Sequence, residues 1–272
     1  MRVLNLKPDR STRLLLTCLP FALVAGSYLI SSAVRLAENP NDKLLPSLGR
    51  MGEAIRTLAL VADPRTGTYL FWSDTLMSLE RLGWAMLIST LAALCIGIPM
   101  GLLPIGRALL SRFVAVLSMV PPLALLPILF IMIGLGEVSK IALIVIGTLP
   151  FLLRDLALRI EELPREQLIK AQTLGGSTWH IALRIVLPQM LPRVIDAVRL
   201  SLGPAWLFLI AAEAIAADSG LGYRIFLVRR YLAMDVILPY VAWITLLAFA
   251  ADAALVWLQR KLFPWFAEAR AS

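Results

Sequence analysis

Few residues of this 272-residue chain are of a type that could do chemistry at a catalytic site. It has one histidine, His180, and two cysteines, Cys18 and Cys95, each within an apolar run. The chain has no CxxC, HExxH or Gly-Lys sequence, which nearly excludes zinc chemistry and a Walker A phosphate loop. No nucleophile with a neighbouring base is visible either. We therefore expect no catalytic residue, no metal site and no cofactor in this chain.

Two acidic residues, Glu213 and Asp252, lie inside long apolar runs. A carboxylate in the middle of a membrane costs about 2.5–3.5 kcal/mol on insertion scales, so each should face protein or water. Glu213 could line a pathway, or hold an outer gate by pairing with Arg224 or Arg81, and we favour a structural or gating role over substrate binding. Asp252 has no obvious partner by sequence, and a packing hydrogen bond is as consistent as a functional role.

The longest polar interval of the chain, residues 155–193, separates two apolar runs. It contains Ala171-Gln172-Thr173-Leu174-Gly175 and, ten residues after the glycine, Ile185-Val186-Leu187-Pro188. Pro164 suits the first turn of a helix, and glycine suits its end. Ser177 can cap a second helix that stops at the proline. The interval therefore predicts a helix, a glycine corner and a second helix.

The elements that must position these residues are membrane helices. Hydrophobic residues make up 59% of the chain and charged residues 16%, against about 45–50% and 25% in soluble domains. The net charge of +8 does not require nucleic acid, because Lys and Arg flank membrane helices on the cytoplasmic side. That rule places the polar hairpin and both termini in the cytoplasm. We expect six spans, over residues 14–34, 82–106, 113–136, 140–153, 194–216 and 236–258.

Within this framework, the third span should be bent or broken, because it contains Pro121-Pro122 and Pro127. Broken membrane helices often line transport pathways, which makes Met119, Pro121 and Pro122 pathway candidates. Trp206 in the fifth span is a further candidate, although packing is the commoner role. Arg107 and Arg112 indicate a short turn before the third span, and Lys140 is expected to extend its amine to the membrane surface.

The segment after the first span and a glycine pair in the second span also suggest local structure. Ser47 could cap a short helix that runs to Ala62, either in the outer interface or as an ordinary connection. Gly97-x-x-x-Gly101 would let another helix approach closely. We divide the chain into residues 1–70 (tail, first span and outer segment), 71–265 (main transmembrane domain) and 266–272 (tail).

The spacing of Gly175, nine residues and Ile185-x-Leu187-Pro188 resembles the cytoplasmic coupling loop of ABC importer permeases. That family's loop begins Glu-Ala-Ala, then three residues, then the glycine; here the positions hold Ile169, Lys170 and Ala171, and only the alanine fits. The family's glutamate contact with the ATPase would therefore be replaced, with Lys170 or Gln172 as the substitutes.

Further motifs are similar to the nitrate/sulfonate/taurine branch of type I importers, over about residues 75–262. They are Pro121-Pro122-x-x-x-x-Pro127, Gly134-Leu135-Gly136-Glu137 with Ser139-Lys140, Ala205-Trp206 with Ala212-Glu213, and Ser219-Gly220-Leu221-Gly222-Tyr223. The resemblance implies an all-α transmembrane domain of the bacterial inner membrane. It also implies a second permease copy, two ATPase subunits that bind ATP and Mg²⁺, and a periplasmic or lipid-anchored solute-binding protein.

The resemblance assigns two sets of residues. Those expected to couple to the ATPase are Lys170, Ala171, Gln172, Leu174, Gly175, Ile185, Leu187 and Pro188. Those expected in the pathway or gate are Met119, Pro121, Pro122, Trp206 and Glu213. The branch transports nitrate, taurine, alkanesulfonates and related compounds, and nothing in the sequence selects among them.

Two other classes of membrane protein are alternatives to the permease. A secondary transporter or channel would show a relay of intramembrane ionisable residues or an internal repeat, and the chain has two scattered acids and no clear repeat. A membrane-embedded enzyme would need a catalytic cluster. The permease of an ATP-driven importer is the prediction that the motifs favour.

Overall fold

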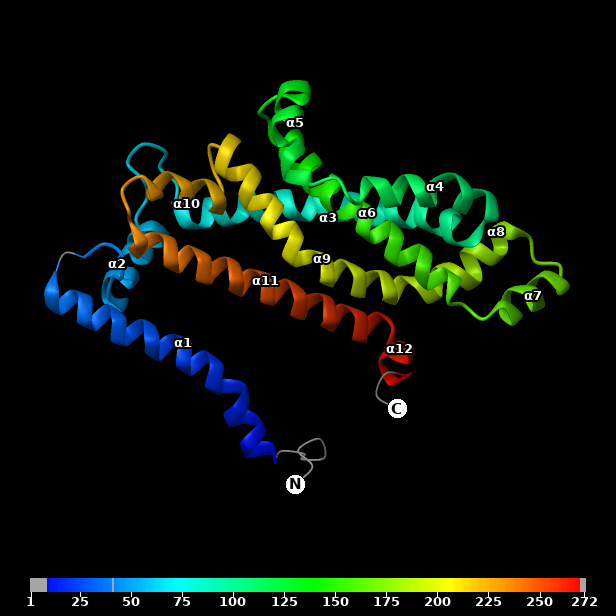
Figure 1. Ribbon diagram of the computed structural model, residues 1–272, viewed down its shortest axis with the longest axis horizontal. Coiled ribbons are helices and arrows are strands. Elements are labelled where there is room, and N and C mark those ends of the chain that lie inside the picture. Colours follow the sequence, from blue (N-terminus) through cyan, green and yellow to red (C-terminus); the bar gives the residue numbers. More distant parts are fainter. Residues whose placement is uncertain (1–8, 41, 270–272) are drawn as a thin grey trace. The chain divides into compact units, whose positions relative to one another are not determined.

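The computed structural model describes residues 9–40 and 42–269, and this part of the chain is helical without a strand (Figure 1). In chain order, the helices of the first half are α1 (Arg10–Glu38), α2 (Leu48–Leu60), α3 (Leu70–Leu102), α4 (Pro104–Leu117), η2 (Pro122–Leu125), α5 (Leu126–Ile133) and α6 (Glu137–Glu161). They are followed by α7 (Arg165–Thr173), α8 (Thr178–Ile181), the π-helical η3 (Ala182–Val186), α9 (Leu187–Ala216), α10 (Leu221–Arg229), α11 (Met234–Leu262) and α12 (Pro264–Ala269).

Five helical stretches of the described residues are long and apolar enough to cross a membrane: α1, α3, α6, Thr178–Ala216 and α11. The pair Pro104–Leu117 and Pro122–Ile133 makes a sixth if it counts as one span. The predicted all-α membrane fold with about six spans is therefore confirmed.

The chain forms two compact units, one of residues 1–69 with 228–241 and the other of residues 70–227 with 242–272. In the first unit, Ser47 caps α2 by accepting a hydrogen bond from the backbone N–H of Arg50, as predicted. Tyr28 and Ser32 of α1 donate to the carbonyls of Pro46 and Leu45, at 2.6 and 2.9 Å. These bonds hold the segment after α1 against the helix.

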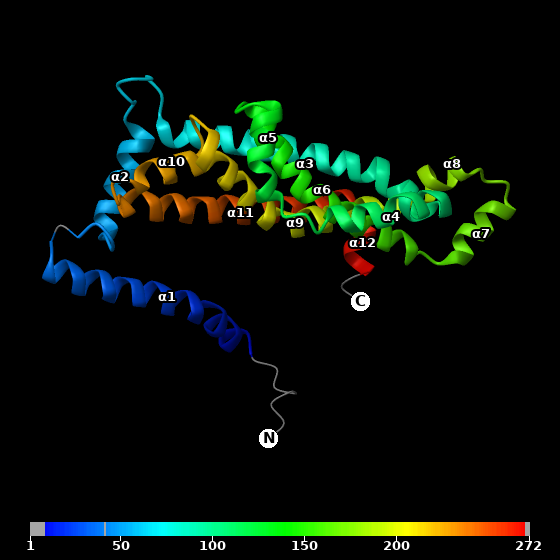
Figure 2. The same cartoon turned by 45° about the horizontal axis from the view of Figure 1, so that its top comes forward.

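In the second unit, α3, α6 and α9 pack side by side (Figures 1 and 2). The predicted close approach at Gly101 is present, because a Cβ there would lie 2.9 Å from Cβ of Ile160 on α6. Ser89 and Thr148 share a hydrogen bond of 2.9 Å within the same contact. The hairpin of α7 and α8 lies at one end of this layer and α10 near the other (Figure 2).

The predicted break in the third span is present. α4 and the η2–α5 segment meet at an angle of 82°, and α5 turns sharply away from α4 in Figure 1. The break falls at Ser118–Pro121, directly before the second proline. Since prolines cannot donate to the ladder, the helix cannot continue straight through them.

The predicted turn at Arg107 and Arg112 is wrong, because both arginines lie within α4. The turn is instead a single residue, Leu103, and Pro104 starts the new helix at a position where its missing N–H costs nothing. Arg107 folds back to the carbonyl of Gly101 at 2.8 Å.

The spans also begin earlier than the hydropathy suggested. α3 starts at Leu70 and includes the charged residues Asp74 and Arg81, which are buried and ion-paired. We had expected the amine of Lys140 to extend away from the helix to the membrane surface, but the side chain is not exposed. It is buried within α6 and donates to Glu137, three residues earlier, at 2.8 Å. Paired charges therefore extend these helices instead of ending them.

Candidate functional site

The predicted helix–glycine corner–helix arrangement is present at one end of the second unit. α7 ends at Thr173, and Gly175 adopts a φ of +81°, in the left-handed region that glycine enters at little cost. The N–H of Gly176 then bonds to the carbonyl of Ala171 at 2.9 Å, which closes the helix end. Ser177 caps α8 by accepting from the N–H of His180.

Residues of α7 make little contact with the rest of their own chain. None of them is buried, and the side chains of Lys170 and Gln172 are exposed. Two apolar side chains of α7 and its C-terminal cap are also exposed, Ile169 by 57% and Leu174 by 80%. A polar helix that presents two apolar side chains to its surroundings has the chemistry of a docking surface.

The prediction that the second helix stops at Pro188 is wrong. After α8 the chain makes a π-helical turn, Ala182–Val186, and then continues without interruption as α9 to Ala216. Proline in a regular α-helix clashes with the carbonyl four residues before it. The wider π turn directly before Leu187 and Pro188 accommodates that ring. Ile185 and Leu187 are half-buried and Pro188 is exposed.

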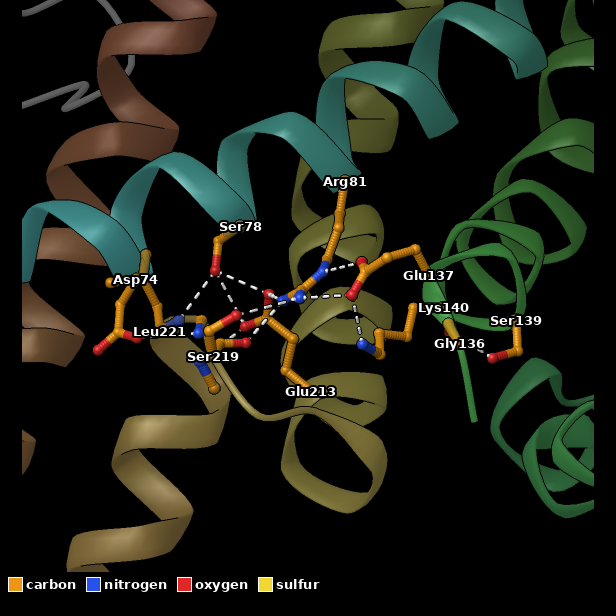
Figure 3. A network of polar contacts seen from close by, with 12 residues as sticks. Asp74, Ser78, Arg81, Gly136, Glu137, Ser139, Lys140, Glu213, Ser219 and Leu221 are labelled. Carbon is orange, nitrogen blue, oxygen red and sulfur yellow. Dashed lines mark hydrogen bonds and ion pairs between the residues drawn. The ribbon is translucent and has the colours of Figure 1, made fainter. Parts of the chain in front are cut away.

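A second cluster of polar residues lies at the other end of α9, around Glu213 (Figure 3). This carboxylate is completely buried. It accepts hydrogen bonds from the hydroxyl of Ser78 at 2.8 and 3.0 Å, from Nη1 of Arg81 at 2.7 Å and from the N–H of Gly222 at 2.8 Å. The charge is thus neutralised by one guanidinium, and both oxygens are occupied.

Arg81 connects three helices, since it pairs with Glu213 of α9 and with Glu137 at the start of α6 (Figure 3). Its Nε and Nη2 donate to the two carboxylate oxygens of Glu137, at 2.5 and 2.9 Å. Its Nη1 also donates to the carbonyl of Ser219 at 2.7 Å. Lys140 donates to the same Glu137, which therefore has two cationic partners.

Asp74 holds the loop between α9 and α10. Its Oδ1 accepts from the N–H of Gly220 at 3.0 Å, and its Oδ2 accepts from Nε of Arg224 at 2.8 Å. The N–H of Leu221 donates to Ser78 at 2.9 Å. Residues 219–222 are thereby fixed over Glu213. We call the set Asp74, Ser78, Arg81, Glu137, Lys140, Glu213 and Ser219–Gly222 the buried latch, because all of these residues except Glu137 are buried or half-buried.

Of the two partners considered for Glu213, the structure has Arg81, whereas Arg224 pairs with Asp74. Asp252 also has a partner, because Arg199 donates to its two oxygens at 2.7 and 3.0 Å. The sequence thus offered Arg81 as one of two partners of Glu213, but it identified neither the Arg224–Asp74 pair nor the Arg199–Asp252 pair. A signal was present for the latch, since Asp74, Ser78 and Arg81 follow i, i+4, i+7 spacing and so share one face of α3.

The other pathway candidates lie at separate places. Met119 and Pro121 are exposed at the break, and Pro122 lines a cavity there. Trp206 is buried in α9, and its indole N–H has no hydrogen-bond partner among the described residues. The hairpin, the break and the latch are thus three distinct sites, and the roles of their residues stay predictions.

These features define a class of protein: a multi-pass helical membrane protein with a broken span and an exposed hairpin. The family model of the binding-protein-dependent transport system inner membrane component matches residues 85–267, and the chain belongs to this family. It is an ABC importer permease subunit of the inner membrane. The predicted family is confirmed.

Curated relatives agree with this assignment. The taurine transport system permease protein TauC of Escherichia coli K12 is 35% identical over 197 residues, which is 72% of each chain. A putative ABC transporter permease of Methanocaldococcus jannaschii is 30% identical over 83% of this chain and 84% of its own. The bicarbonate transport system permease protein CmpB of Synechococcus elongatus is 29% identical over 70% and 69%.

Among solved structures, an inward-facing conformation of the MetNI methionine ABC transporter has a similar fold. The TM-score is 0.59 at 20% identity, with 71% of this chain and 96% of that chain covered. At that identity the likeness concerns the fold alone.

Proposed function

We propose that this permease carries a small polar solute such as nitrate, a sulfonate, taurine or a similar compound, and that ATP hydrolysis in a partner subunit drives the import. The relatives named for taurine and bicarbonate support a solute of this size and polarity. A solute of this kind crosses a bilayer very slowly unaided, because each ionised group must leave water.

The working assembly in this proposal has two copies of the chain, two ATP-binding-cassette subunits that hold ATP and Mg²⁺, and a solute-binding protein outside. Both termini and the α7–α8 hairpin lie on the ATPase side. The excess of Lys and Arg around the hairpin supports that orientation. It includes Arg159, Arg165, Lys170, Arg184 and Arg193.

The observation that carries the coupling role is the exposed hairpin with its left-handed corner. α7 buries none of its residues in its own chain, and Leu174 is 80% exposed beside the corner. In the proposed mechanism α7 inserts into a groove of the ATPase. Closure of the ATPase dimer on ATP then moves the hairpin and tilts α9, which follows it after the π-helical segment, as a rigid body.

Gly175 gives a sharp test, because a Cβ built there would have nothing within 4 Å. The only penalty of a side chain is therefore backbone strain at a φ of +81°, about 1–2 kcal/mol for an ordinary residue. Asn tolerates this region much better than Val. Gly175→Val should distort the corner, and Gly175→Asn is the matched control that should keep it.

The experiment uses the complex with its ATPase and binding protein in proteoliposomes. We expect Gly175→Val to insert normally, to lose uptake and to lose the stimulation of ATP hydrolysis by the solute-loaded binding protein. Gly175→Asn should retain most of both, and vanadate should block wild-type uptake. Normal solute-stimulated hydrolysis in Gly175→Val would rule out the coupling role.

A further inference from the structure

The break in the third span leaves a cavity of about 420 Å³ against α6. One wall comes from the break itself and includes Ser118 and Pro122, and the other comes from α6 and includes Gly147, Phe151 and Arg154. Its volume falls within the range of small-molecule sites. In a membrane, broken backbone persists where it lines a cavity that holds water or is covered by protein.

Arg154 is the cation of α6 that no carboxylate neutralises within the described residues. The other two cations of this helix are paired, Lys140 with Glu137 at 2.8 Å and Arg159 with Asp155 at 2.5 Å. The guanidinium of Arg154 makes a long contact instead, from Nη1 to the hydroxyl oxygen of Ser118 at 3.4 Å.

Arg154 brings a positive charge to the cavity wall. Asp155 also lines it, but that carboxylate already accepts a hydrogen bond from Arg159. Ser118 donates its own proton to the carbonyl of Ala115 at 2.7 Å, so its oxygen is left to accept from Arg154. A neutral hydroxyl orients the guanidinium across the break without cancelling its charge.

We propose that this cavity binds the anionic group of the transported solute, with Arg154 as its direct ligand and Ser118 as the residue that positions Arg154. The inference rests on the proposed function and narrows its solute class to anions with several oxygen atoms, such as a sulfonate, bicarbonate or nitrate. Such oxygens match the planar fork of guanidinium donors, which can bind two of them at once.

Arg154 lies far along α6 from the buried latch. Arg154 follows Glu137 by 17 residues of α6, about 26 Å along the helix axis. A flanking arginine that only anchors the helix at the membrane surface would sit at a similar depth. A neutral substitution of Arg154 should weaken anion binding if Arg154 is an anion ligand, and should leave it unchanged if Arg154 only anchors the helix. Arg112 of α4 serves as the control. It is also exposed, and it does not line the cavity.

The test measures binding without ATP, by equilibrium dialysis of the full-length permease in nanodiscs. The probes are radiolabelled methanesulfonate, taurine and bicarbonate, in a buffer free of sulfonates. We expect saturable binding of at least one probe to the wild type. Arg154→Gln should weaken it about 10–100-fold, because a charge-assisted hydrogen bond is lost. Arg154→Lys should weaken it less, and Arg112→Gln should not change it.

Three results would overturn the site: no saturable binding of any probe to the wild type, wild-type binding in Arg154→Gln, or an equal loss in Arg112→Gln. Uptake by the wild-type complex is measured separately with vanadate. Uptake that persists in vanadate would contradict the ATP-driven function and leave the binding result intact, so the two failures can be told apart.

Discussion

The buried latch gives the clearest stability prediction, through Arg81→Met. The substitution keeps most of the side-chain volume and removes the cation that is bonded to Glu213, a carboxylate with no exposed surface. The hydroxyl of Ser78 and the N–H of Gly222 remain as donors, but neither carries a charge. Removing one partner of a buried ion pair costs about 3–5 kcal/mol.

Thermal unfolding in detergent, followed by tryptophan fluorescence, measures this cost. For a chain of this size about 2–4 °C of Tm corresponds to each kcal/mol, so Arg81→Met should lower Tm by roughly 6–20 °C. Arg107→Met is the matched control, because its pair with Glu161 is exposed by 45% and 38% and contributes less than about 1 kcal/mol.

The double variant Arg81→Met/Glu213→Gln separates the charge from the shape. Its neutral amide needs no counter-ion and its oxygen can still accept from Gly222, so it should recover part of the lost Tm. If the double variant instead loses the sum of the two single losses, the buried charge is not the cause of the instability. A wild-type Tm in Arg81→Met would refute the reasoning outright.

Two further predictions use the same unfolding assay. Gly101→Val should destabilise by about 1–3 kcal/mol, because its Cβ would lie 2.9 Å from Cβ of Ile160 and α3 and α6 would have to separate. Gly83→Ala, where a Cβ meets nothing within 4 Å, should not lower Tm. Asp252→Asn should cost less than about 1 kcal/mol, because Asp252 and Arg199 are 40% and 27% exposed; a loss as large as that of Arg81→Met would contradict this.

Composition and spacing predicted the elements that depend on local chemistry. The glycine corner at Gly175, the Ser47 and Ser177 caps and the break at Pro121-Pro122 follow from what each residue type can do with its own backbone. Each of these needed only a few neighbouring residues to decide it. These features are present where they were expected.

Two errors at the helix ends came from charged residues that pair with acidic side chains, one close in the chain and one distant. Lys140 and Arg81 look like the ends of apolar runs, yet both continue into buried helix because acidic side chains meet them there. Glu213 and Arg81 are 132 residues apart. A hydropathy scale cannot detect such ion pairs, because it gives each charged residue the same value whether or not it has a partner. Pro188 misled for another reason, because one π turn relieves the clash that would otherwise end the helix.

The hairpin and the latch are attached to the two ends of one helical stretch, Thr178–Ala216, about 58 Å long. Its first turns include the π segment, which interrupts the regular α-helical hydrogen-bond pattern. Its far end is held to α3 through Glu213. Gly175→Val and Arg81→Met therefore perturb opposite ends and should fail differently. The first strains an exposed corner by about 1–2 kcal/mol, so coupling should be lost with a small decrease in Tm. The second should lower Tm much more, with the hairpin itself unchanged.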